Sequence, residues 1–141
     1  MTSSTMRVHV LRLTPGQEVK TCLKEFVARE APGGAFVMTC CGSITTATLR
    51  MAAAPDGTTD KVVRYEKHFE VLGMSGTISQ GGTHLHICLS DHQGCTVGGH
   101  VVGDLNVFTT MEVVLGEPKD LRMGRALDPV TGFTELTVTK D

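Results

Sequence analysis

The chain has 141 residues, of which 40% are hydrophobic and 20% charged, so it is long enough to bury the core of one domain. A formal net charge of −2 and an aromatic content of only 4% disfavour binding to DNA or to single-stranded nucleic acid. No apolar run of about 18 residues predicts a membrane span, and the N-terminal residues lack the pattern of a signal peptide.

One amphipathic helix is predicted after a first strand at residues 6–13. Its apolar residues recur at i, i+3, i+4, i+7 and i+8, which is the helical period. This stripe consists of Val19, Cys22, Leu23, Phe26 and Val27. Thr14 is the expected N-cap, Pro15 the first helical residue and Gln17 the partner in a capping box. The APGG run at residues 31–34 is expected to end the helix.

Most of the remaining chain is predicted to form short antiparallel strands, because segments rich in Val, Ile, Thr and Phe alternate with Gly, Asp and Pro. The expected strands span residues 35–41, 44–51, 61–66, 68–78, 83–90, 95–102, 107–115 and 133–139. Residues 52–60 are an expected flexible connection, and residues 116–132 an expected long loop. One principal helix on a mainly antiparallel sheet predicts a single α+β domain over residues 1–141, with a core at about 6–116 and a C-terminal loop and strand at 117–141.

Residues 82–100, GTHLHICLSDHQGCTVGGH, hold four of the six histidines and predict a β-hairpin. The DHQG segment favours a type I turn followed by Gly94 in the left-handed conformation, which is the usual three-residue loop with a bulge. That loop pairs Asp91 with Cys95. It thereby sets the register of the two strands, and a loop one residue shorter or longer would mix polar and apolar residues on each face.

In this register His86 lies directly opposite His100. His84 and Cys88 point to the same face as these two residues, whereas the apolar residues of both strands point to the other face. The apolar set consists of Leu85, Leu89, Val97 and Val101. His92 lies in the turn and is excluded from the cluster.

Three imidazoles within a few ångströms suit zinc, iron or a similar divalent transition metal. Such a set leaves coordination positions open for water or a substrate. Gly98 and Gly99 place no side chain beside His100, so a ligand or another backbone segment can approach closely there. We therefore predict His84, His86 and His100 as metal ligands, with Gly98 and Gly99 as ligand-binding residues.

A metal-free alternative stays open, in which the same histidines are polar surface or interface residues. Glu70 and Glu112, in two other predicted strands, are candidate ligand-binding carboxylates, although their spacing does not fix them at the site. Arg50 and Arg64 either bind an anion or are solvated strand residues. No nucleotide-binding motif, nucleophile elbow or Cys–His pairing is found, so the catalytic residues stay unknown.

Several short motifs, in this order, resemble the plants-and-prokaryotes conserved (PPC) domain family over about residues 6–116. They are LTPGQEV, CGSITTATLR, HFEVLGMSGTI, THLHICLSD, GCTVGGHVVGDL and MEVVL. The resemblance implies a compact α+β fold that assembles as a homotrimer. Plant members of this family also carry an AT-hook, an Arg-Gly-Arg-Pro arm that enters the DNA minor groove, and act as nuclear regulators. This sequence contains no Arg-Gly-Arg-Pro, so the resemblance does not transfer DNA binding to it.

We therefore expect a homo-oligomeric, cytoplasmic PPC-domain protein that binds a metal ion or a small-molecule ligand at a histidine-lined face. Five cysteines without C-x-x-C spacing agree with reduced thiols in an intracellular compartment. Two alternatives stay open. One is a DNA-associated regulator in the nucleus, by family analogy, and the other is a metal-dependent enzyme acting on a small polar substrate.

Overall fold

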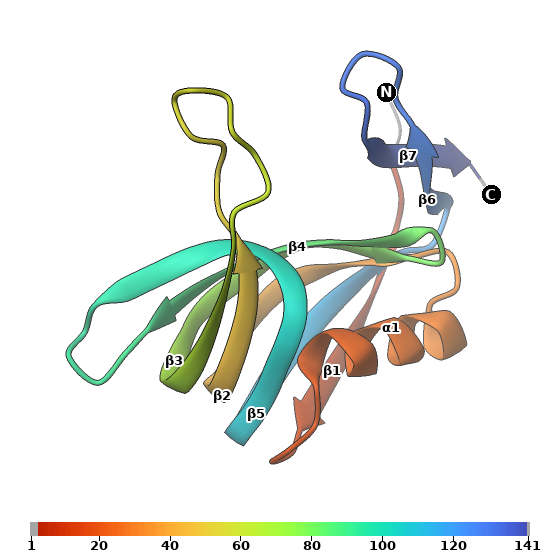
Figure 1. Ribbon diagram of the computed structural model, residues 1–141. Coiled ribbons are helices and arrows are strands. Elements are labelled where there is room, and N and C mark those ends of the chain that lie inside the picture. Colours follow the sequence, from red (N-terminus) through yellow and green to blue (C-terminus); the bar gives the residue numbers. More distant parts are fainter. Residues whose placement is uncertain (1–2, 141) are drawn as a thin grey trace.

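A five-stranded antiparallel sheet with one helix forms the main body of the chain, and a separate two-stranded sheet follows it (Figure 1). The structure is a computed structural model, and it describes residues 3–140. The elements in chain order are β1 (Met6–Leu13), α1 (Val19–Glu30), β2 (Ala35–Arg50), β3 (Val62–Ser79), β4 (Gly82–Ser90), β5 (Thr96–Pro118), β6 (Leu121–Leu127) and β7 (Thr134–Lys140). The predicted α+β class, with one helix and a mainly antiparallel sheet, is confirmed.

The long strand β5 organises the sheet. The strand order is β1-β5-β2-β3-β4, and β4 also pairs with the first residues of β5. Strands β2, β3, β4 and β5 therefore form a closed ring of pairings, and β1 remains at an edge. Because β5 pairs with both β2 and β4 near its start, residues from these three strands are neighbours on one side of the sheet.

The core lies between α1 and the sheet. Val19, Leu23 and Val27 of the predicted helical stripe are buried, and the helix packs on β3 and β5. The largest fully buried side chains of the sheet include Phe69, Leu49, Leu85, Leu105 and Met111. Burial of each such side chain contributes about 1.5–3 kcal/mol before the loss of conformational entropy is counted. This packing fixes the sheet on which the histidines lie. The helix is also too short and too polar to cross a bilayer, and no other helix occurs in residues 3–140.

The prediction that Thr14 caps the helix is wrong. The side chain of Gln17 does accept a hydrogen bond from the Thr14 backbone N–H at 2.8 Å, but this contact closes a turn before the helix. Gly16 has φ +83° in that turn, and the next residues remain extended against β5. Glu18 is the N-cap, and its carboxylate accepts hydrogen bonds from the first helical turn and from the Leu105 backbone N–H. A contact between distant segments thus sets the start of the helix.

The expected long loop at residues 116–132 is also wrong. Strand β5 continues to Pro118, and residues 121–127 form β6, which pairs in full with β7. The sequence LRMGRAL has little alternation and no β-branched residue, so its strand conformation depends on the partner strand. Neighbouring segments that the sequence predicts as separate strands also join into the long strands β2, β3 and β5, with irregular register in several places.

Candidate metal centre

The β4–β5 hairpin has the predicted turn. Gly94 has φ +78° and its backbone N–H donates to the Asp91 carbonyl oxygen at 2.9 Å. The Asp91 backbone N–H donates to the Cys95 carbonyl oxygen at 3.0 Å, and the Asp91 carboxylate accepts from the Gln93 and Cys95 N–H groups. An Asp at the first turn position and a Gly at the fourth therefore close the loop as expected.

The register that follows from this turn is confirmed. His86 pairs directly with His100, and Leu89 pairs with Val97. His100 is also the direct partner of Arg50, at the end of β2. Since directly paired residues of neighbouring strands project to the same face, Arg50, His100 and His86 form one row across β2, β5 and β4.

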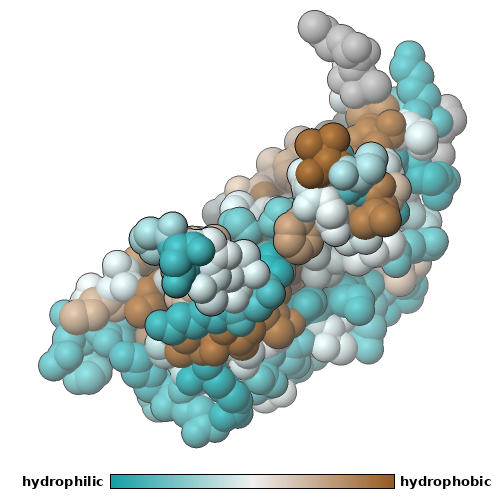
Figure 2. Space-filling model, turned by 45° about the horizontal axis from the view of Figure 1, so that its top comes forward, coloured by the Kyte–Doolittle hydropathy of each residue, from teal (hydrophilic) through white to brown (hydrophobic). Residues whose placement is uncertain are grey.

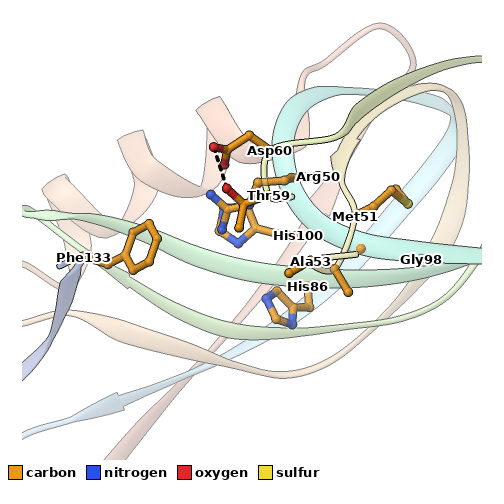
Figure 3. A pocket seen from close by; sticks show the side chains of 11 residues that line it. Arg50, Met51, Ala53, Thr59, Asp60, His86, Gly98, His100 and Phe133 are labelled. Carbon is orange, nitrogen blue, oxygen red and sulfur yellow. Dashed lines mark hydrogen bonds between the residues drawn. The ribbon is translucent and has the colours of Figure 1, made fainter. Parts of the chain in front are cut away.

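The three histidines of β4 and β5 lie within reach of a single ion. One nitrogen from each of His84, His86 and His100 can be chosen so that all three lie within 4.8 Å of one another. The Nε2 atoms of His84 and His86 are 3.1 Å apart. Two nitrogens bound to one tetrahedral zinc ion at about 2.05 Å would lie about 3.3 Å apart. The observed separation is therefore close to that of two ligands of one metal. Figure 3 shows the side chains of His86 and His100 near each other, and their ring centroids are 5.5 Å apart.

The surroundings favour the neutral, metal-binding form of two of these imidazoles. Burial, followed by the positive charge of Arg50, lowers the pKa of His100 from its usual 6.5 to about 4. Burial, followed by the neighbouring His86, lowers the pKa of His84. Metal ions bind only deprotonated imidazole nitrogen, so both shifts reduce competition from protons near neutral pH.

One further observation agrees with a divalent transition metal bound by the three histidines. The Nδ1 atom of His100 is buried and has no hydrogen-bond partner in the described chain. Buried polar atoms without a partner are rare and indicate a bound ion, water or ligand, or a strained site. No carboxylate of residues 3–140 forms an ion pair with any of the three imidazoles, and the cluster that could hold an ion consists of three nitrogen ligands.

Two adjoining hollows open beside the cluster. The first has a volume of about 420 Å³, and its walls include His86, the β2–β3 connection and the start of β5. The second, of about 310 Å³, lies between His84 and the β6–β7 hairpin. Arg50, His100 and Phe133 line both. Figure 3 shows Phe133 on one side of the imidazoles, with Asp60 and Thr59 near Arg50 on another.

Gly98 and Gly99 line the first hollow, and the close approach that they allow is that of other strands. A Cβ atom on Gly98 would lie 2.7 Å from the Ile87 carbonyl oxygen, and one on Gly99 would lie 2.7 Å from the Arg50 carbonyl oxygen. The two glycines therefore permit tight packing of β5 against β4 and β2. A role in contacting a ligand stays a prediction.

Glu70 and Glu112 are not brought to the three histidines. Glu70 lines a separate hollow of about 230 Å³ with His68 and Phe108, whose rings stack at 4.1 Å. Glu112 contacts the Cys41 thiol, with 3.9 Å between Sγ and Oε2. Their proposed ligand-binding role stays a prediction, now at places apart from the histidine cluster.

Sequence reasoning missed several residues around the cluster. Arg125 comes from β6, Phe133 from the β6–β7 turn, and Asp60 from the β2–β3 connection. No local motif marks any of them. The sequence offers Arg50 and Arg64 as candidates for binding an anion. The pairing of β2 with β5 places Arg50, and not Arg64, directly opposite His100.

An α+β domain with a histidine cluster on paired strands is the class of protein that the fold and site define. The chain belongs to the Plants and Prokaryotes Conserved (PCC) domain family, whose profile matches residues 1–119. The family resemblance seen in the sequence is thereby confirmed.

Two curated relatives contain this domain in longer chains. The bifunctional protein GlmU of Synechococcus sp. (strain JA-3-3Ab) is 38% identical over 138 residues, which are 98% of this chain and 21% of that protein. AT-hook motif nuclear-localized protein 20 of Arabidopsis thaliana is 35% identical over 114 residues, 77% of this chain and 39% of that protein. The chain thus spans about a fifth and about two fifths of their lengths.

Solved structures share the fold. A hypothetical protein from Salmonella enterica superposes with a TM-score of 0.91 at 35% identity, covering 99% of this chain and 97% of that one. A metal-containing protein from Archaeoglobus fulgidus superposes with a TM-score of 0.73 at 22% identity, covering 97% and 99%. At the latter identity the likeness concerns the fold alone.

Proposed function

We propose that this PCC-domain protein binds a divalent transition-metal ion, zinc or iron-like, through His84, His86 and His100. The observation that carries the proposal is the convergence of three imidazole nitrogens within 4.8 Å. Three neutral nitrogens suit an ion of borderline softness better than calcium or magnesium, which prefer oxygen ligands. Three protein ligands leave at least one position for water or a small ligand, facing the adjoining hollows.

Metal analysis of protein purified without a histidine tag tests this proposal. We expect about one ion per chain. Structural zinc sites with four ligands bind with about 10–16 kcal/mol, or about 3 kcal/mol per ligand, so loss of one histidine should weaken binding about a hundredfold or more. His86→Ala should therefore abolish retention of the metal, whereas His92→Ala, in the turn of the same hairpin, should retain it. Equal metal content in the two variants would refute the ligand assignment.

A homotrimer is the assembly that we propose. Val8 and Val10 project from the edge strand β1 and are exposed, Val10 to 76%. Exposed apolar residues on an unpaired edge favour association with another chain. Figure 2 shows further apolar patches within the polar surface on one face of the molecule. Sedimentation equilibrium should give three times the chain mass of 15.1 kDa, and Val10→Lys should shift the equilibrium toward monomer. A wild-type monomer at micromolar concentration would contradict the proposal.

DNA binding is the second candidate, and the plant relative with an AT-hook in its name is the observation that favours it. Against it stand the net charge of −2 and the lack of an Arg-Gly-Arg-Pro arm in this sequence. We propose a cytoplasmic location; the five free cysteines support a reducing intracellular compartment. Anisotropy of a labelled A·T-rich duplex should remain unchanged at 150 mM salt with micromolar protein. A salt-dependent rise in anisotropy would favour the regulatory function instead.

A further inference from the structure

Arg50 is the cation placed closest in register to the histidine cluster. It pairs with His100 across β2 and β5, and His100 pairs with His86 across β5 and β4. The three side chains therefore share one face in consecutive strands. Arg50 also lines both hollows beside the cluster, so its position relative to the candidate metal ligands follows from strand pairing and not from a loop.

The guanidinium of Arg50 has no hydrogen bond or ion pair with any of residues 3–140. Arg64, the other arginine candidate, is ion-paired with Glu66 and lies 3.5 Å from the Asp104 carboxylate. Arg125, across the second hollow, donates to the Thr77 hydroxyl. Arg50 keeps its whole planar set of donors available, and such a set matches two oxygens of a carboxylate or phosphate; Arg125 has one donor on Thr77, and its buried Nε has no partner among residues 3–140.

The charge balance around the cluster also favours an anion. A divalent ion on three neutral imidazoles carries two positive charges, to which Arg50 and Arg125 add two more. The carboxylates that line the hollows are Asp60 and Glu135. Each carboxylate already accepts a hydrogen bond from a neighbouring threonine. The loaded site therefore keeps a net positive charge that a monoanion or dianion would balance.

The space beside Arg50 has an apolar side. Phe133 lines both hollows, and 60% of its surface is exposed. Figure 3 shows its ring separated from His86 and His100 across the hollow. The larger hollow, about 420 Å³, is within the usual range for small-molecule sites. An anion with a small apolar or planar body would therefore reach the ion and Arg50 while covering the Phe133 ring.

We propose that the site binds a small organic oxyanion, with one oxygen on the metal ion, the anionic group on Arg50 and the apolar body against Phe133. This inference rests on the proposed metal binding, because the ion supplies one of the two contacts to the anion. It goes beyond that function by naming the chemical class of the ligand. Carboxylates and phosphates share the required chemistry, and the test separates them.

Calorimetric titration of the zinc-loaded protein with benzoate, acetate and inorganic phosphate tests the inference. We expect benzoate to bind more tightly than acetate, because only benzoate carries a ring. Phosphate binding equal to or tighter than benzoate would identify the ligand as a phosphate ester instead of a carboxylate. Failure of the zinc-loaded protein to bind any of the three anions would overturn the proposal.

Variants then assign the contacts. Arg50→Met should weaken anion binding at least tenfold while leaving zinc stoichiometry unchanged, and Arg50→Lys should restore part of the affinity. Arg64→Met, a matched loss of charge in an ion-paired arginine, should bind anions as the wild type does. Phe133→Ser should weaken benzoate more than acetate. Unchanged anion affinity in Arg50→Met would refute the anion site alone, whereas a wild-type protein that binds no zinc would refute the metal site on which it rests.

Discussion

The Gly98→Ala variant tests whether the glycines beside His100 permit close packing of the strands or leave room for a ligand. The new Cβ atom would lie 2.7 Å from the Ile87 carbonyl oxygen, and ordinary contact begins at 3.4 Å. Strands β4 and β5 would have to separate by about 0.7 Å, a mismatch of the size that usually costs about 1–3 kcal/mol. Replacing glycine by alanine also reduces the conformational entropy of the unfolded chain, which stabilises the folded protein by about 0.5 kcal/mol. We therefore expect a net loss of about 0.5–2.5 kcal/mol.

Thermal unfolding of the metal-free protein, at one protein concentration, measures this loss. The expected fall in Tm is about 2–10 °C for a chain of this length. Gly103→Ala is the matched control in the same strand, since its Cβ atom would meet nothing within 4 Å. It should melt at or slightly above the wild-type temperature. If Gly98→Ala were as stable as the control but no longer bound anions, the glycine would serve the ligand and our packing argument would be wrong.

Three further outcomes are expected. Lowering the pH from 7.5 to 6.0 would weaken zinc binding to three imidazoles of ordinary pKa about fiftyfold. Because the pKa values of His84 and His100 are lowered, the loss of zinc affinity in this protein should be well below fiftyfold. Competition with a chelator at the two pH values measures it. Glu18→Ala should reduce the free energy of unfolding by about 1–2 kcal/mol in urea, because the helix loses its N-cap; an unchanged midpoint would argue against this cap. Gly94→Val should cost about 1–2 kcal/mol, since a β-branched residue at φ +78° is strained, and it should weaken zinc binding through the hairpin register; wild-type affinity and stability would contradict the role of the turn.

The sequence predicts elements whose conformation depends on nearby residues. The apolar stripe of α1 and the DHQG turn are local patterns, and the turn alone places His86 opposite His100. The start of α1 and the strand β6 depend on distant partners, namely β5 and β7, and both predictions fail there. Arg50 joins the histidine row only through the pairing of β2 with β5, which no local pattern reveals.

Phe133 is missed for a different reason. The sequence predicts it only as the first residue of a strand at 133–139, but it lies in the turn between β6 and β7 and lines both hollows. A site assembled from a hairpin, a strand end and a distant turn can be predicted only in the part that the hairpin supplies. For this chain that part is the three histidines.

X-ray absorption at the metal edge, on protein loaded with one equivalent of zinc, tests the central proposal most directly. We predict three imidazole nitrogens at about 2.0–2.1 Å with at least one further light-atom ligand, and the imidazole scattering should fall by a third in His100→Gln. A first shell of water oxygens only, a sulfur ligand at about 2.3 Å, or a spectrum unchanged in His100→Gln would show that His84, His86 and His100 do not hold the ion.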